Sequence, residues 1–175
     1  MLEPATSTLA ATAMVQPLPH RSIVSLSAFR GQSAALGQAL GVDLPAAPRR
    51  ITVQNTIYLW SGVESWLAIS ENPELFANIS QSAAKLAAVT EQGDGRFLFR
   101  VAGPFARQIL AKLVPIDLHP SVFPPDAVAL TLAAHIGVTL WAEDDGGFIL
   151  ACFRSFGAAL HHALIEAAAE FENRG

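Results

Sequence analysis

The chain has 175 residues, a formal net charge of −4 and a single cysteine, Cys152. This length can bury a core without a disulfide or a structural metal, and one cysteine excludes an intrachain disulfide. The scattered Lys and Arg residues form no basic stripe, which argues against nucleic acid as a partner. No run approaches the roughly 18 apolar residues of a membrane span, so we expect a soluble, cytoplasmic protein without a membrane partner.

The fraction of charged residues is low. Only 15% of residues are charged, against roughly 25% in typical soluble domains. A surface that is poor in charge is one that a partner protein can cover. Much of the apolar content is alanine, however, which raises the mean hydropathy without creating a sticky patch, so composition alone leaves both interpretations open.

The N-terminal stretch is rich in Ala, Thr, Ser and Pro and lacks the basic and unbroken apolar regions of a secretory signal. We predict that residues 1–20 form a flexible tail. We predict a single α+β domain over residues 21–175, built from two related halves at about residues 21–92 and 93–175.

The first half shows strand and helix patterns in a recognisable order. Strands are expected at residues 23–29, 51–59, 66–69 and 87–91, and helices at residues 31–40 and 73–86. The second and third strands form a hairpin. The resulting order, β-α-β-β-α-β, is that of the ferredoxin-like split unit.

The second half repeats this pattern after the turn Gly93-Asp94-Gly95. A strand is predicted at residues 96–102, and a helix then begins at Gly103 and Pro104. Residues 114–125 carry four prolines and must be irregular. Three further strands are predicted at residues 128–133, 135–141 and 148–153, and Ser155 can cap a final helix whose apolar stripe contains Phe156, Leu160, Leu164, Ala167 and Phe171.

Few residues are placed for chemistry. The sequence contains no G-x-S-x-G, no Gly-rich phosphate loop and no metal-ligand spacing. Cys152 lies in an apolar strand, where burial would keep it inert. Asp117 and His119 are the only neighbouring carboxylate and imidazole; they form either a proton-transfer dyad or, as Asp often does in turns, a loop in which Asp117 binds backbone amides.

Other polar and aromatic candidates have two interpretations each. His161 and His162 are adjacent on a helix, so they cannot chelate one ion as an i, i+4 pair would, and we expect them to face solvent. Trp60 and Trp66 flank the first hairpin turn, where they either contact a partner or cover the core. Arg154 either pairs with a carboxylate of a partner or caps its own loop.

Four segments of the chain resemble the gamma subunit of heterotetrameric sarcosine oxidase. They start at residue 60 (Trp-Ser-Gly-Val-Glu-Ser-Trp-Leu), residue 100 (Arg-Val-Ala-Gly-Pro-Phe-Ala-Arg-Gln-Ile-Leu), residue 115 (Pro-Ile-Asp-Leu-His-Pro-Ser-Val-Phe-Pro) and residue 154 (Arg-Ser-Phe). The Asp-Leu-His-Pro loop followed by Phe-Pro is the most specific. The similarity extends over about residues 23–171.

This resemblance implies a fold similar to the folate-binding domain of the glycine-cleavage aminomethyltransferase. It implies a complex that oxidatively demethylates sarcosine to glycine, reduces O2 to H2O2 and passes the methyl carbon to tetrahydrofolate. The alpha, beta and delta subunits would hold FAD, FMN, NAD, zinc and tetrahydrofolate, and the gamma chain would be structural. The implied signature and contact residues are Trp60, Trp66, Gly103, Pro104, Arg107, Asp117, His119, Pro120, Phe123 and Arg154.

Two segments depart from the related patterns. The acidic residue that the aminomethyltransferase uses in a strand is absent from residues 136–141, and the Asp-x-Ser before the central turn is replaced in residues 89–93. The first departure argues against a catalytic folate enzyme. A subunit of a related N-methyl amine oxidase or dehydrogenase and a stand-alone folate-binding, aminomethyltransferase-like protein remain the alternatives.

Overall fold

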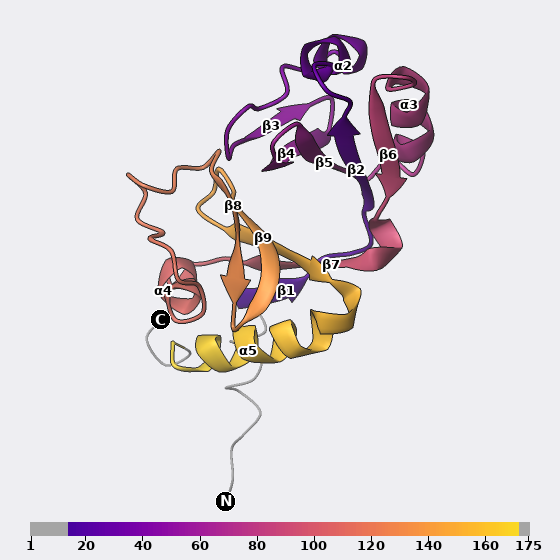
Figure 1. Cartoon of the computed structure of the whole chain (residues 1–175). Helices are drawn as coiled ribbons and strands as arrows, with labels where there is room; N and C mark the ends of the chain where they lie inside the picture. The colour runs from indigo at the N-terminus through magenta and orange to yellow at the C-terminus, as the bar shows by residue number, and fades with distance from the viewer. Residues whose placement is uncertain (1–13, 172–175) are drawn as a thin grey trace, which may run out of the picture. The chain divides into compact units, whose positions relative to one another are not determined.

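The computed structural model of the chain describes residues 14–171. Its contacts divide the chain into two compact units. We call His20–Gly95 the inserted unit, and the described residues up to Pro19 together with those from Arg96 onward the split unit (Figure 1). Among the described residues, each unit contains one antiparallel five-stranded sheet and two α-helices.

The inserted unit has the order of a ferredoxin-like fold with one extra edge strand. Its elements are β2 (Ser22–Ala28), α2 (Ser33–Leu40), β3 (Arg50–Val53), β4 (Thr56–Gly62), β5 (Ser65–Ser70), α3 (Leu75–Ser82) and β6 (Ala87–Glu91). The sheet order is β3-β4-β5-β2-β6. Apolar side chains from the sheet, such as Val24 and Leu26, pack with Leu36 of α2 and Ile79 of α3 to form its core.

The split unit repeats this order, except for the last strand, after a 3-10 turn at Gly93–Gly95. Its elements are β7 (Arg96–Val101), α4 (Ala106–Ala111), β8 (Val128–Ala133), β9 (Ile136–Ala142), β10 (Phe148–Phe153) and α5 (Gly157–Ala169). A second 3-10 turn, Arg154–Phe156, leads into α5. The core packs Phe99, Leu140 and Leu150 of the sheet against Leu160 and Leu164 of α5.

The last strand of the split unit comes from the start of the described chain. β1 (Val15–Pro17) pairs antiparallel with β7, with Val15 opposite Val101, and gives the sheet order β1-β7-β10-β9-β8. β1 therefore occupies the place in the split unit that β6 occupies in the inserted unit. Val15 is fully buried in the core, because its side chain completes the apolar face that β7 begins.

The N-terminal prediction needs correction in part. Residues 1–13 of the expected tail lie outside the described residues, but residues 14–20 are not a tail, since β1 lies within them and Leu18 N–H donates to Leu98 O at 2.9 Å. The unit boundary falls after Gly95, close to the expected division of the two halves at residue 92.

The predicted mixed α+β class with two related halves is confirmed, and both sheets are antiparallel. The differences from the prediction are local. The strand expected over residues 51–59 is two strands, β3 and β4, separated by a tight turn at Gln54 and Asn55, whose φ angles are 48° and 64°. Ser155 does not cap α5, which begins after Phe156 without a side-chain cap. The helices α3 and α4 are also shorter than their apolar patterns suggest, and neither has a side-chain hydrogen bond at its N-cap.

Within residues 14–171, none of the helices combines the length and the apolar character that a membrane crossing needs.

Candidate functional site

The proline-rich connection between α4 and β8 contains Asp117 and His119, which do not form a dyad. Asp117 Oδ1 accepts a hydrogen bond from the backbone N–H of His119 at 2.8 Å. The imidazole Nδ1 lies 2.7 Å from Ser121 Oγ. Each side chain thus contacts the residue two positions further on, as in the turns that Asp favours. The geometry agrees with the alternative in which Asp117 binds a backbone amide of its own loop.

We call residues 115–124 the signature loop, and Arg107 of α4 fixes it to the core of the split unit. The Arg107 guanidinium donates a hydrogen bond to Leu118 O and lies 5.0 Å above the ring of Phe148. Phe123, at the other end of the loop, is buried and stacks on the same Phe148 ring at 6.2 Å. The loop is therefore held against the Phe148 ring at two points, one through Arg107 and the other through Phe123. Val122, just before Phe123, is 59% exposed.

The Gly103-Pro104 pair turns the chain from β7 into α4. Gly103 has a φ angle of +95°, a conformation that L side chains rarely adopt, so glycine is required here. α4 begins at Ala106, two residues after Pro104, and places Arg107 in its first turn. These two residues thus orient the arginine that holds the signature loop.

Three other predicted residues lie on α5 or in the 3-10 turn before it. The guanidinium of Arg154 lies 4.5 Å above the ring of Phe97. His162 is exposed and faces Glu166 at 3.3 Å, as expected, but His161 is not solvent-facing. Its ring stacks on Phe99 at 5.4 Å, and its Nε2 is buried without a hydrogen-bond partner among the described residues.

A turn beside the end of β7 carries a charged network. Arg100 Nε donates to Glu143 Oε2 at 2.6 Å, and Arg100 Nη2 donates to Asp145 Oδ2. The hydrogen bond to Glu143 raises the pKa of Arg100. The backbone N–H of Gly147 and the nearby Arg100 charge lower the pKa of Asp145. These groups brace the β9–β10 turn and leave no uncompensated acid or base there.

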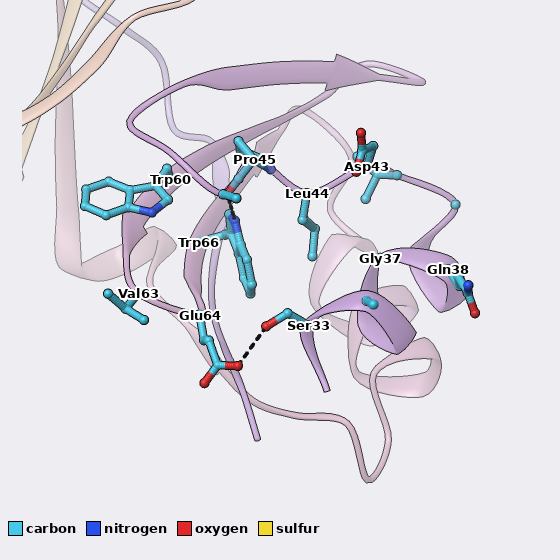
Figure 2. A pocket seen from close by; sticks show the side chains of 14 residues that line it. Ser33, Gly37, Gln38, Asp43, Leu44, Pro45, Trp60, Val63, Glu64 and Trp66 are labelled. Carbon is cyan, nitrogen blue, oxygen red and sulfur yellow. Dashed lines mark hydrogen bonds between the residues drawn. The ribbon is translucent and has the colours of Figure 1, made fainter. Parts of the chain in front are cut away.

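The inserted unit contains a groove with a volume of about 690 Å³. Figure 2 shows it between α2, the connection that follows α2 and the β4–β5 turn. Trp66 is buried and its indole N–H donates to Pro45 O at 2.8 Å, so it covers the core. Trp60 pairs with Trp66 across the two strands and is only half-buried at the groove.

Two polar side chains of this groove, Ser33 and Glu64, are engaged with each other. Glu64, which has a positive φ of 54°, accepts hydrogen bonds from Ser33 Oγ at 3.1 Å and from Gly31 N–H at 3.3 Å. The described residues that line the groove include two carboxylates and one serine but no histidine, cysteine or lysine. The arrangement suits binding of an apolar group more than acid–base or nucleophilic chemistry.

The remaining reactive groups are also isolated. Cys152 is fully buried, and burial raises the pKa of its thiol. No group of three or more His, Cys, Asp or Glu side chains in the described part of the chain is arranged to hold a metal ion. The signature residues thus form two separate sets, Trp60 and Trp66 in the inserted unit and the rest in the split unit.

Sequence reasoning missed the contribution of Ser33 and Glu64 to the groove, because the two residues are 31 positions apart. The position of Glu64 in a tight hairpin turn was the one available signal. It also missed the exposed apolar residues of β8, Leu130 and Leu132, although a strand pattern without any charge was visible.

Comparison with known proteins places these features in one family. The family model described as "Sarcosine oxidase, gamma subunit family" matches residues 26–170. The sarcosine oxidase subunit gamma of Corynebacterium sp. (strain P-1) is 30% identical over 168 residues, which cover 93% of this chain and 83% of the relative.

Two solved structures agree in fold. A chain of the heterotetrameric sarcosine oxidase from Corynebacterium sp. U-96, in complex with pyrrole 2-carboxylate, superposes with a TM-score of 0.83 and 28% identity, covering 98% of this chain and 97% of that one. The glycine cleavage system aminomethyltransferase T from Bartonella henselae gives a TM-score of 0.63 at 14% identity, covering 97% of this chain and 54% of that one. The second likeness concerns the fold alone.

Proposed function

The chain belongs to the sarcosine oxidase gamma subunit family, and from this premise we propose that it is the non-catalytic assembly subunit of a cytoplasmic heterotetrameric sarcosine oxidase. The complex would demethylate sarcosine to glycine, reduce O2 to H2O2 and pass the methyl carbon to tetrahydrofolate. The alpha, beta and delta subunits would hold FAD, FMN, NAD, zinc and tetrahydrofolate.

One observation carries the proposal. The fold agrees over nearly the whole length of both chains with a chain from a solved heterotetrameric sarcosine oxidase. The side chains support a structural role, because Asp117 and His119 are engaged within the signature loop and Cys152 is buried. We propose the exposed tip of that loop, with Pro120 and Val122, and the half-buried Trp60 as contacts with other subunits.

Co-expression with the large flavoprotein subunits tests the proposal. We expect a stable yellow complex that contains this chain in a fixed ratio and oxidises sarcosine. If the flavoproteins assemble and turn over normally without the chain, and the chain purifies alone, the proposal is wrong. A complex that forms but oxidises a different N-methyl amine would retain the assembly role and correct the substrate.

Titration of the isolated chain with tetrahydrofolate separates this role from that of a folate-binding protein. We expect no heat or fluorescence change at near-millimolar folate, with the assembled complex as the positive control. Saturable binding to the isolated chain would instead favour the aminomethyltransferase-like alternative. Trp60 and Trp66 lie at the groove, so their fluorescence would report a ligand bound there.

A further inference from the structure

β8 is an edge strand whose outer backbone groups have no partner among residues 14–171. The pair Ala133 and Ile136 closes the two-residue turn to β9, and Ala142 N–H donates to Ala127 O. Because hydrogen-bonded and non-bonded pairs alternate along antiparallel strands, the N–H and C=O groups of Leu130 and Leu132 point away from β9. They offer a row of donors and acceptors that another extended chain can complete.

The corresponding edge of the inserted unit is protected by polar side chains. β3 occupies the same place in its sheet as β8, and the matching outward-pointing residues there are Arg50 and Thr52. Arg50 Nη1 lies 3.5 Å from Thr52 Oγ1, along the edge. Charged edge residues of this kind discourage pairing with another strand. In β8 these two positions are leucines, which are 49% and 47% exposed.

The surface next to these leucines is hollowed and apolar. A depression of about 380 Å³ is lined by residues that include Leu130, Leu132, Gly137 and Phe153. Gly137 lies directly opposite Leu132, and a Cβ atom placed on it would meet open space. Glycine in a strand interior often marks a close approach of another chain, and here it leaves room for a side chain of a docked segment.

Arg96 borders the same depression and offers a positive charge. Its guanidinium lies 4.8 Å above the half-exposed Phe153 ring, and its Nε is buried without a hydrogen-bond partner in the described chain. Burial lowers the pKa of Arg96, since desolvation disfavours the charged form. A carboxylate supplied by a partner would compensate the guanidinium charge at the edge of this depression.

From these observations we propose that β8 binds an extended, apolar segment of a partner subunit as an added strand, and that the same partner supplies a carboxylate to Arg96. The inference rests on the proposed function, because it takes the partner to be another subunit of the complex. The outer backbone groups of β8 require the partner segment to be extended. The apolar surface at Leu130, Leu132 and Gly137 favours apolar side chains in that segment, and Arg96 favours an acidic group beside them.

Variants of the surface test the proposal in the co-expressed complex. Leu132→Lys places a charge on the edge, and Gly137→Val fills the hollow with a residue that strands favour. We expect each to lower the amount of chain recovered with the partner subunits at least tenfold. Thr52→Lys, at the matching position of β3, is the control and should assemble like the natural chain. Far-UV circular dichroism of each isolated variant shows that it is folded.

Hydrogen exchange distinguishes strand addition from a contact made by side chains alone. We expect the amides of Leu130 and Leu132 to exchange rapidly in the isolated chain and at least tenfold more slowly in the complex. The amide of Thr131, which faces β9, should be protected in both. Protection of Leu130 and Leu132 in the dilute isolated chain, or protection that rises with its own concentration, would assign the edge to this chain or to a second copy and overturn the proposal.

The outcomes separate this inference from the proposed function. If the natural chain assembles and Leu132→Lys and Gly137→Val assemble equally well, the surface proposal is wrong and the assembly role stands. If the natural chain fails to join the flavoprotein subunits, both are wrong. Arg96→Met retains an apolar contact with Phe153 but removes the charge. We expect this variant to assemble less well, and its assembly to depend less on salt concentration than that of the natural chain. An unchanged salt dependence would refute the proposed contact of Arg96 with a partner carboxylate.

Discussion

The inserted unit and the split unit use the same strand order but differ in the origin of their last strand and in their exposed edges. The inserted unit is continuous in sequence and closes its sheet with β6, whereas the split unit takes its last strand, β1, from the part of the chain that precedes the inserted unit. The matching edges also differ, with Arg50 and Thr52 on β3 and Leu130 and Leu132 on β8. The comparison shows that a repeated fold can place a protected surface in one copy and an open one in the other.

The largest expected effect comes from breaking the split unit at β1. Val15→Asp would place an unpaired carboxylate in a fully buried position, and we expect the free energy of unfolding to fall by roughly 3 kcal/mol or more. Urea denaturation measures the loss, and Gln16→Asp, at the exposed neighbouring position, is the control. A loss below about 1 kcal/mol for Val15→Asp would mean that β1 adds little to the split unit.

A stabilising change is expected at the β8–β9 turn, which matches the β3–β4 turn of the inserted unit. Ala134 and His135 have φ angles of 48° and 66°, a conformation that favours Asn and Gly. Replacing this pair by Asn-Gly should raise the free energy of unfolding by about 1 kcal/mol. Asn55→Ala at the matching β3–β4 turn should lower the free energy of unfolding. Thermal melts compare the two variants with the natural chain, and a shift of the same sign in both would contradict the correspondence of the two turns.

The signature loop is the connection of the split unit that corresponds to the shorter connection between α2 and β3. Asp117→Ala removes the acceptor of the His119 amide, and we expect a loss of about 1 kcal/mol together with poorer assembly. Asp117→Asn keeps an acceptor oxygen and should restore most of both quantities. Normal assembly with lost turnover in both variants would instead show that the carboxylate acts in catalysis.

The smallest effect concerns acid stability. Because the folded-state pKa of Asp145 is lowered, its contribution is present above its unfolded pKa of about 3.9 and is lost as pH falls through the folded value. The side chain is 62% exposed, so we expect a loss below about 1 kcal/mol. Arg100→Gln should reduce this part of the pH dependence. Urea denaturation at a series of acidic pH values measures the free energy of unfolding of the natural chain and of the variant, and the same pH dependence in both would exclude this contribution of Asp145.

Local patterns were sufficient for most of the fold. The strands at residues 87–91, 128–133 and 148–153 were predicted at their observed bounds, because apolar and β-branched residues there are bounded by clear turn residues. β1 was not predictable in this way. It is three residues long, ends in Pro17 and is stabilised by partners on β7 that lie about 80 residues away.

The same distinction applies to the candidate sites. The hydrogen bond of Asp117 to a loop amide follows from the residue type and its position in a turn, and the burial of Cys152 follows from its apolar neighbours. The contact of Glu64 with Ser33 and the open edge of β8 depend on which elements become neighbours. Such information is absent from any short window of sequence.

The unusual origin of β1 has a consequence for how the chain reaches its native state. β1 and β7 are antiparallel neighbours, so the whole inserted unit takes the position of a hairpin loop, and closing a loop of that length carries an entropic cost. Folding of the inserted unit brings its two ends together, with His20 Nε2 3.4 Å from Asp94 Oδ1. A folded inserted unit shortens the effective loop to a turn, so its folding lowers the entropic cost of pairing β1 with β7.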